Sequence, residues 1–275
     1  MLFRSLAQAH TDASGWGIVP VHEASAAALS AAKKALALAP DMVQAHLAMA
    51  YIQMGYQWDW AGAEASMQRA LQLAPDNADV MTTATKLSFC LRRLDAAETF
   101  GQRAIALDPL NPISHRFLAM VRFSAGNLDG AVKSLCQSLE LSPDSIATRH
   151  VLAIIRSAQG RHQEALAAAM EEKAEWARLT ALSIVKWAMG SAADKLESDT
   201  ALAMLIEKHG QEHCAVQISH LHAIRGDADG TFLWLERAYS QRDAGLSYII
   251  AAPFFDPVKH DPRWAVFVKK MGLEV

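Results

Sequence analysis

The chain has 275 residues, of which 52% are hydrophobic and 20% charged, so it can bury a large apolar core. Its formal net charge of -3 and its scattered basic pairs argue against nucleic acid or a membrane surface as a partner. No apolar run is long enough to span a bilayer, and three widely spaced cysteines (Cys90, Cys136 and Cys214) argue against a disulfide framework. We therefore expect a cytoplasmic protein without a cofactor.

Apolar residues recur at helical spacing along nearly the whole sequence. The pattern predicts helices, in chain order, at 3–14, 22–38, 42–55, 60–73, 77–91, 94–107, 112–125, 128–141, 145–159, 162–174, 176–189, 193–209, 212–225 and 228–240. Leu246–Phe255 could pass for a short strand, but a lone strand would have no partner. The expected fold class is all-α.

A repeat becomes visible when four similar segments are aligned on their prolines. The segments read ALALAPD, ALQLAPD, AIALDPL and SLELSPD, and their prolines, which recur every 34 or 35 residues, are Pro40, Pro75, Pro109 and Pro143. A period of about 34 is typical of tetratricopeptide repeats, which stack helix pairs into a solenoid. Each proline would end the second helix of its pair.

Small residues recur at fixed places before these prolines. Five residues before each proline stand Ala35, Ala70, Ala104 and Ser138, and twelve before it stand Ala28, Ala63, Ala97 and Ala131. Positions seven apart share one helix face, and small side chains there let paired helices cross closely. Gly126 and Gly160 are expected to end first helices in the left-handed conformation.

The same pattern gives the expected domain organisation, a single solenoid over 1–275. It has a degenerate repeat at 1–40, regular repeats at 41–174, divergent repeats at 175–243 and an Asp-Pro-rich cap at 244–275. The aromatic residues of the cap would cover the exposed face of the last helix pair, as a terminal repeat requires: Phe254, Phe255, Trp264 and Phe267.

Two tryptophans flank an aspartate in the turn of the second repeat, Trp58-Asp59-Trp60. Asp59 can cap the helix that begins at Trp60. The favoured interpretation is that the indoles pack on neighbouring helices and seal this longer turn. A role in stacking on a ligand stays open.

The segments YQWDWAGAEASMQRALQLAP, ESDTALAMLIEKHG and GDADGTFLWLERAYSQRDAGLSYIIAAPFFDPVKHDP resemble the C-terminal tetratricopeptide region of bacterial multidomain regulators. These regulators include class III adenylate or guanylate cyclases and winged-helix transcriptional activators. The resemblance implies a right-handed superhelix of antiparallel helix pairs. Because no effector domain precedes the repeats here, we expect a fragment or stand-alone descendant of a larger regulator.

In such a superhelix the first helix of each pair lines a concave groove, which the resemblance implies is the binding surface. The implied groove residues, by repeat position, are Thr82, Lys86, Phe89, Arg116, Met120, Phe123, His150, Ile154 and Ser157. This mixture suits a protein or peptide partner with apolar anchors and one acidic group. A regulatory or homo-oligomerising tail of a signalling protein is the alternative function.

Motifs of catalysis are absent from the sequence: it has no phosphate-binding loop, dinucleotide fingerprint, zinc-protease motif or nucleophile elbow. The cluster HGQEHCAVQISHLH carries four histidines and Cys214, but His213 and His220 would lie about 10 Å apart along a helix, too far for one metal ion. We therefore predict neither an enzyme nor a metal site.

Overall fold

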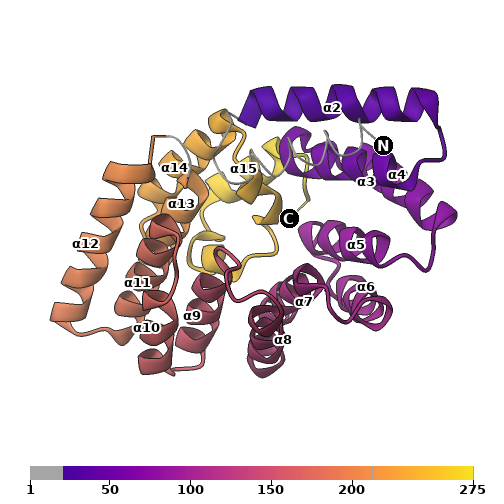
Figure 1. Ribbon diagram of the computed structural model, residues 1–275. Helices are drawn as coiled ribbons and strands as arrows, with labels where there is room; N and C mark the ends of the chain where they lie inside the picture. The colour runs from indigo at the N-terminus through magenta and orange to yellow at the C-terminus, as the bar shows by residue number, and fades with distance from the viewer. Residues whose placement is uncertain (1–20, 212–213, 275) are drawn as a thin grey trace. The chain divides into compact units, whose positions relative to one another are not determined.

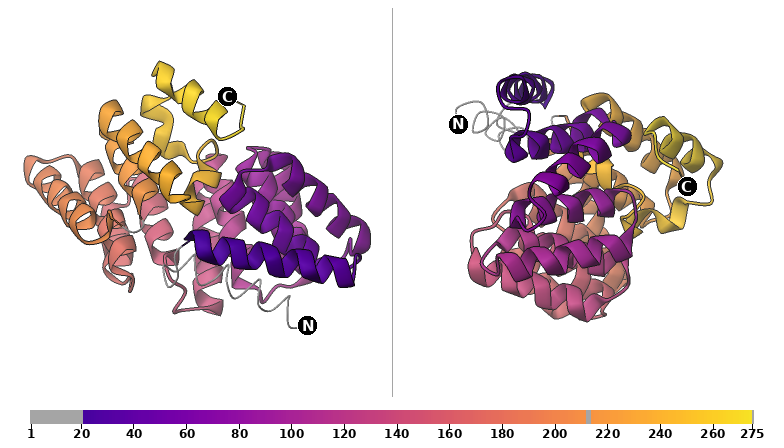
Figure 2. Two further views of the ribbon diagram at one scale, coloured as in Figure 1. Left: turned by 90° about the horizontal axis from the view of Figure 1, so that it is seen from above. Right: turned by 90° about the vertical axis from the view of Figure 1, so that its right-hand side faces the viewer.

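The computed structural model describes residues 21–211 and 214–274. Helices make up this part of the chain, and no strand occurs within it. Successive helices lie side by side in pairs, as Figures 1 and 2 show for α11 and α12. The predicted all-α fold is confirmed. The first expected helix, at 3–14, lies outside the described residues.

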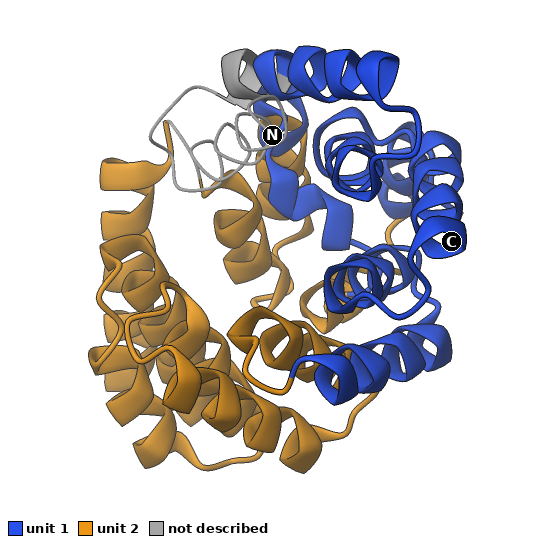
Figure 3. Ribbon diagram, turned by 45° about the vertical axis from the view of Figure 1, so that its right-hand side comes forward, with its two compact units in different colours: residues 1–108, 238–251, 262–275 blue, residues 109–237, 252–261 orange. Residues whose placement is uncertain are grey.

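The chain divides into two compact units, which Figure 3 colours separately. The first unit holds α2 (Val21–Leu38), α3 (Val43–Ile52), the π-helix η1 (Gln53–Gln57), α4 (Trp60–Leu73), α5 (Ala78–Cys90), α6 (Leu94–Leu107), the 3-10 helix η2 (Ala244–Tyr248) and α15 (Pro262–Lys270). The second unit holds α7 (Pro112–Ser124), α8 (Leu128–Leu141), α9 (Thr148–Ala158), α10 (His162–Met170), α11 (Glu175–Met189), α12 (Ala192–His209), α13 (Ala215–Ala223) and the 3-10 helix η3 (Pro253–Val258). Most of α14 (Ala228–Gln241) belongs to the second unit, and its last residues belong to the first.

The small residues of the repeat lie where paired helices cross. The alanines at 28, 63, 70, 97, 104 and 131 are 0% exposed, Ala35 is 4% exposed and Ser138 is 1% exposed. Ser138 also donates a hydrogen bond from its Oγ to the Pro112 carbonyl, 2.9 Å away on the neighbouring first helix. These positions have no room for a larger side chain without moving a helix.

The turn inside each pair requires a residue in the left-handed conformation. Gly126 and Gly160 take φ angles of +79° and +75° in the fourth and fifth repeats. In the third repeat the equivalent residue is Arg92, which takes φ +55° without being glycine. Asn127 then caps α8, because its side-chain oxygen accepts a hydrogen bond from the Gly130 amide at 3.0 Å.

Four predicted helices differ from the structure by more than one residue at an end. The helix expected at 42–55 ends as α3 at Ile52 and continues as the π-helix η1, and the helix expected at 212–225 is Ala215–Ala223. The helix expected at 145–159 begins only at Thr148, because Ala147 takes a left-handed φ of 59°. The helix expected at 162–174 ends at Met170.

The early end of α10 has a visible cause in Glu172, which is 2% exposed. One of its carboxylate oxygens accepts a hydrogen bond from the His150 amide in the first turn of α9, and the other accepts from the Ala174 amide just before α11, both at 3.2 Å. A carboxylate in this position accepts hydrogen bonds from backbone amides at two helix starts. This arrangement favours a loop after Met170 over an extension of α10.

The segment after α14 is irregular. The residues that could have formed a strand, Leu246–Phe255, contribute instead to η2 and η3. Pro253 begins η3, and Pro257 inside it prevents a regular α-helix there because it lacks the backbone donor. The chain then forms α15, which returns to the second repeat: the Trp60 indole Nε1 donates to the Met271 carbonyl at 2.7 Å.

Ala63→Leu should lower the free energy of unfolding by about 1–3 kcal/mol, because the added methylenes would overpack the crossing of α3 and α4. Ala65→Leu is the matched control, since Ala65 lies exposed on the same helix. Urea unfolding of both variants measures the difference. Equal effects at the two positions would contradict the repeat register.

Candidate functional site

In the first unit, the inner-face residues expected on α5 are buried. Thr82, Lys86 and Phe89 are 9%, 7% and 2% exposed. The element that covers two of them is η2: the Phe89 and Tyr248 rings lie 5.7 Å apart, and the Lys86 Nζ lies 5.8 Å from the Tyr248 ring centre. Lys86 also lies 3.6 Å above the ring of Tyr51 on α3, a strong cation–π geometry.

The polar atoms at this contact are inactive at neutral pH. Burial raises the pKa of the Tyr248 hydroxyl to about 12, although the Lys86 charge beside it opposes the shift. Burial also raises the pKa of the Cys90 thiol to about 12, and Ser247 of η2 is its hydrogen-bond partner. A thiol held protonated in this way is not a nucleophile at neutral pH, so the contact between α5 and η2 serves to hold a segment in place.

In the second unit, the expected inner-face residues of α7 are half-buried: Arg116, Met120 and Phe123. Phe123 contacts η3, with its ring centre 6.0 Å from that of Phe254. The residues expected on α9 differ among themselves. His150 is half-buried, whereas Ile154 and Ser157 are 5% and 6% exposed.

A histidine of α13 lies between two aromatic rings of η3. The His220 ring centre is 4.6 Å from that of Phe254, with the planes tilted by 31°, and 4.8 Å from that of Phe255 in an edge-on arrangement. The pKa of His220 is lowered to about 3, mainly by burial and also by the charge that His150 carries once it is protonated at low pH. The imidazole therefore acts here as a neutral aromatic ring.

His150 is the second neutral histidine on this face. Burial lowers its pKa to about 4, and the positive charge of Arg116 contributes to the shift. Both ring nitrogens are covered, and a backbone hydrogen bond with Ala147 opposes only part of the shift. Its ring lies 6.0 Å from the indole of Trp176 on α11, in a T-shaped arrangement.

The Trp58-Asp59-Trp60 turn packs inside the first unit. Asp59 caps α4, since its carboxylate accepts from the Gly62 amide at 2.9 Å. The Trp58 ring centre lies 4.8 Å from that of Tyr239. The Arg242 guanidinium lies over the same indole, 4.5 Å from its ring centre. Both indoles are 7% exposed. These contacts agree with the scaffold interpretation and leave little indole surface for a ligand.

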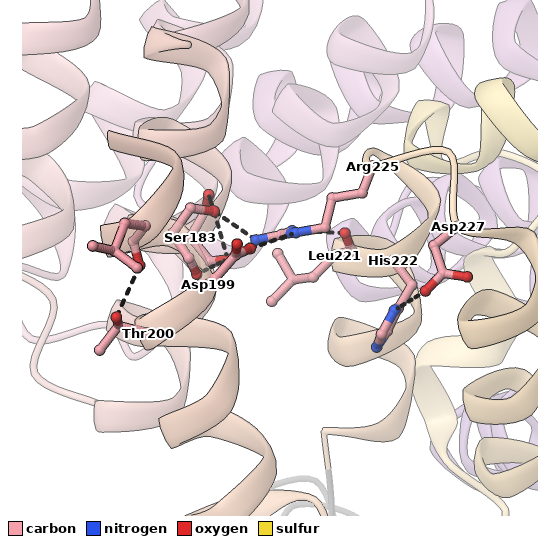
Figure 4. A network of polar contacts seen from close by, with 9 residues as sticks. Ser183, Asp199, Thr200, Leu221, His222, Arg225 and Asp227 are labelled. Carbon is pink, nitrogen blue, oxygen red and sulfur yellow. Dashed lines mark hydrogen bonds and ion pairs between the residues drawn. The ribbon is translucent and has the colours of Figure 1, made fainter. Parts of the chain in front are cut away.

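A polar network around Arg225 joins α11, α12 and α13 in the second unit (Figure 4). Arg225 donates to the Ser183 and Ser198 hydroxyls at 2.9 and 2.5 Å, and to the Leu221 carbonyl at 2.7 Å. Its Nε faces Asp199 at 3.3 Å, and its guanidinium lies 4.7 Å from the Trp187 ring.

This network is closed to a substrate. Ser183 and Ser198 are both 0% exposed, and each hydroxyl donates to the backbone carbonyl of the other residue, at 2.9 and 2.6 Å. Neither serine has a histidine or carboxylate within hydrogen-bond range as a base among the bonds that the described residues form. The network holds three helices together.

The described histidines of the metal-like cluster have separate roles. His209 faces Glu175 at 3.5 Å, His222 faces Asp227 at 2.8 Å (Figure 4), and His220 contacts Phe254. His213 lies outside the described residues. Within 21–211 and 214–274, no three His, Cys, Asp or Glu side chains gather in a way that could hold a metal ion. In the same part of the chain, no helix combines the length and apolarity that a membrane crossing requires.

No known family's sequence profile matches the chain, and no curated protein sequence matches it significantly. Solved structures do match. PilW, a widely conserved type IV pilus biogenesis factor, is 18% identical with a TM-score of 0.61 over 79% of this chain and 97% of its own. A tetratricopeptide repeat protein from Parabacteroides merdae is 14% identical with a TM-score of 0.60 over 93% of this chain and 98% of its own. Yeast Tom70 is 18% identical with a TM-score of 0.53 over 90% of this chain and 53% of its own.

The chain has the tetratricopeptide-repeat fold. At these identities the likeness establishes the fold alone. The closer resemblance to the tail of cyclases and winged-helix activators finds no support among these structures.

Within this tetratricopeptide-repeat chain, two structural features were not expected from the sequence. One is Arg225, whose place beside Gly226 at the end of a short helix carries no recognisable motif. The other is the position of the C-terminal segment, which lies on the first helices of repeats far upstream in the sequence. A Pro-rich stretch with paired aromatic residues is the signal that could have suggested an internal ligand for such helices.

Proposed function

We propose that the chain is a non-enzymatic scaffold that binds a protein or peptide partner on the inner faces of its first helices. One observation carries the proposal: in each unit, such a face already holds an irregular segment of the chain by aromatic contacts. In the first unit Phe89 holds Tyr248, and in the second unit Phe123 and His220 hold Phe254. A surface that accepts one non-helical segment has the shape and chemistry to accept another.

The charge on the inner face of the second unit supports a partner with an acidic group. Arg116 on α7 is close enough to His150 on α9 to lower its pKa, and both histidines of this face are neutral. We propose that a partner carboxylate pairs with Arg116 there. The half-buried Met120 and Phe123 supply apolar contacts, which would give most of the binding energy.

Arg116→Glu should abolish or strongly weaken partner binding, because the substitution places a negative charge opposite the partner's acidic group. The protein and the variant would be used as bait for co-purification from the native cell, with captured proteins identified by mass spectrometry. We expect at least one protein to be enriched on the wild-type bait and lost from the variant.

The control for this experiment is the melting temperature of each variant, which shows whether a loss of capture comes from a disturbed fold. Lys133→Glu, at an exposed position on the second helix of the same repeat, makes the same charge change away from the inner face. Equal capture by the wild type and by both variants would contradict the proposed surface.

A regulatory or oligomerising module of a bacterial adenylate cyclase or transcriptional regulator is the narrower alternative. Its support is the resemblance of three sequence segments, YQWDWAGAEASMQRALQLAP among them. The genomic reading frame upstream of Met1 tests it directly. A cyclase or winged-helix sequence in that frame would favour this alternative, and an unrelated sequence would remove it.

A further inference from the structure

The short helix η3 contributes two neighbouring aromatic residues that are buried to different degrees. Phe255 is 0% exposed and anchors the segment in the core of the second unit. Phe254 is half-buried and lies on the inner face. The anchor and the surface contact are therefore separate residues, and the second can be changed without removing the first.

The Phe254 ring occupies a slot between helices that belong to different repeats. Phe123 of α7 and His220 of α13 form two of its sides, with ring centres 6.0 and 4.6 Å from that of Phe254. Because His220 is neutral, the slot presents aromatic and apolar surface to whatever ring lies in it. Aromatic pairs at these separations contribute about 0.5–1.5 kcal/mol each beyond the burial of their area.

The contacts that keep the Phe254 ring in the slot are weak for a further reason. η3 is a 3-10 helix of six residues with Pro253 and Pro257, and prolines donate no backbone hydrogen bond. The ion pair between Asp256 and Lys259, at 2.6 Å, lies within the segment itself. A partner that fills the slot and makes additional contacts on the inner face can therefore compete with it.

We propose that the slot formed by Phe123 and His220 is a binding subsite for an aromatic side chain of a partner peptide, and that Phe254 is its resident pseudo-ligand. This inference rests on the proposed scaffold function and adds the chemistry of the partner: a non-helical segment with two adjacent aromatic residues bordered by proline, as in PFFDP of the chain itself. In the absence of a partner, η3 occupies the subsite and limits access to it. A partner must displace Phe254. The partner's apparent affinity is therefore its intrinsic affinity for the empty slot multiplied by the fraction of molecules in which Phe254 has left the slot.

The test uses the full chain and a fluorescein-labelled synthetic peptide, IAAPFFDPVKHD, which has the sequence of residues 250–261. Fluorescence anisotropy measures its dissociation constant for the wild-type protein and for Phe254→Ala, in which the slot is vacated and Phe255 keeps its anchor. We expect the variant to bind at least tenfold more tightly than the wild type. A control peptide with alanine at both phenylalanine positions should bind neither protein.

Equal affinity of the peptide for both proteins, no binding to the variant, or equal binding of the control peptide would each overturn the proposal. If Phe254→Ala fails to fold by circular dichroism, Phe254→Leu replaces it, since leucine keeps apolar volume and loses the ring stacking. Adding Phe123→Ala to either variant should reverse the gain. A peptide that fails while Arg116→Glu still loses a captured protein would refute this subsite and leave the proposed function standing.

Discussion

Arg225→Ala should lower the free energy of unfolding by about 3 kcal/mol or more. The substitution removes charge-assisted hydrogen bonds from two serines that are 0% exposed and from the Leu221 carbonyl, and it removes the guanidinium from the face of Trp187. Breaking a buried, hydrogen-bonded charge cluster by removing one member is among the more costly single changes. Urea unfolding at pH 7 measures the effect.

Arg161→Ala is the matched control, because Arg161 pairs with Glu164 on the surface and its side chain is 51% exposed. Surface pairs of this kind contribute about 0–1 kcal/mol, so this variant should be nearly as stable as the wild type. Arg225→Lys keeps the charge and loses the planar fork, and its stability should fall between the two. If Arg225→Ala and Arg161→Ala unfold at the same urea concentration, the network does not hold α11, α12 and α13 together.

Lowering the pH from 7 to 5 should reduce the free energy of unfolding by about 2 kcal/mol for each of two histidines, roughly 4 kcal/mol in total. Burial lowers the pKa of His150 and of His220 from 6.5 to about 4 and about 3. In the unfolded chain both protonate near pH 6.5, so that between pH 6.5 and 4 the unfolded state binds more protons than the folded state. The stability that these two histidines contribute is therefore fully present above pH 6.5 and is lost as the pH falls towards 4.

The variant His220→Phe separates this effect from other groups. Phenylalanine can keep the ring contacts with Phe254 and Phe255 and cannot take a proton. We expect the variant to lose only about half as much stability between pH 7 and 5 as the wild type does. Carboxylates with lowered pKa, such as Asp194 with its Ser191 and Lys186 partners, stay ionised at pH 5 and do not obscure the comparison. A pH dependence identical to that of the wild type would show that His220 is protonated in the folded protein.

The repeat architecture is readable from the sequence because it depends on local rules. Small residues such as Ala63 recur at one phase of the period, and each repeat contacts its neighbours, so spacing alone predicts the pairs of helices. The departures also follow from local backbone chemistry. Ala147 in the left-handed conformation delays the start of α9, and buried Glu172 ends α10 early. Neither residue belongs to a known helix-end signature, so neither could be anticipated.

The surroundings of the candidate site could not be predicted, because they depend on contacts between residues far apart in the chain. Nothing local to Phe123 indicates that Phe254 lies beside it, and nothing local to Trp60 indicates its hydrogen bond to the Met271 carbonyl. The period predicts which residues of α5, α7 and α9 face inward. What lies on that face is decided by the irregular segment after α14, where the repeat ends and the spacing carries no further information.

Photo-crosslinking from position 254 tests most directly that the chain's own C-terminal segment lies on the inner face of the second unit. Benzoylphenylalanine introduced in place of Phe254 would be irradiated in the dilute, partner-free protein, and the crosslinked tryptic peptides would be identified by mass spectrometry. The geometry predicts intramolecular crosslinks to α7 around Phe123 and to α13 around His220, whose rings lie 6.0 and 4.6 Å from that of Phe254. Crosslinks confined to other helices, or only between molecules, would contradict it.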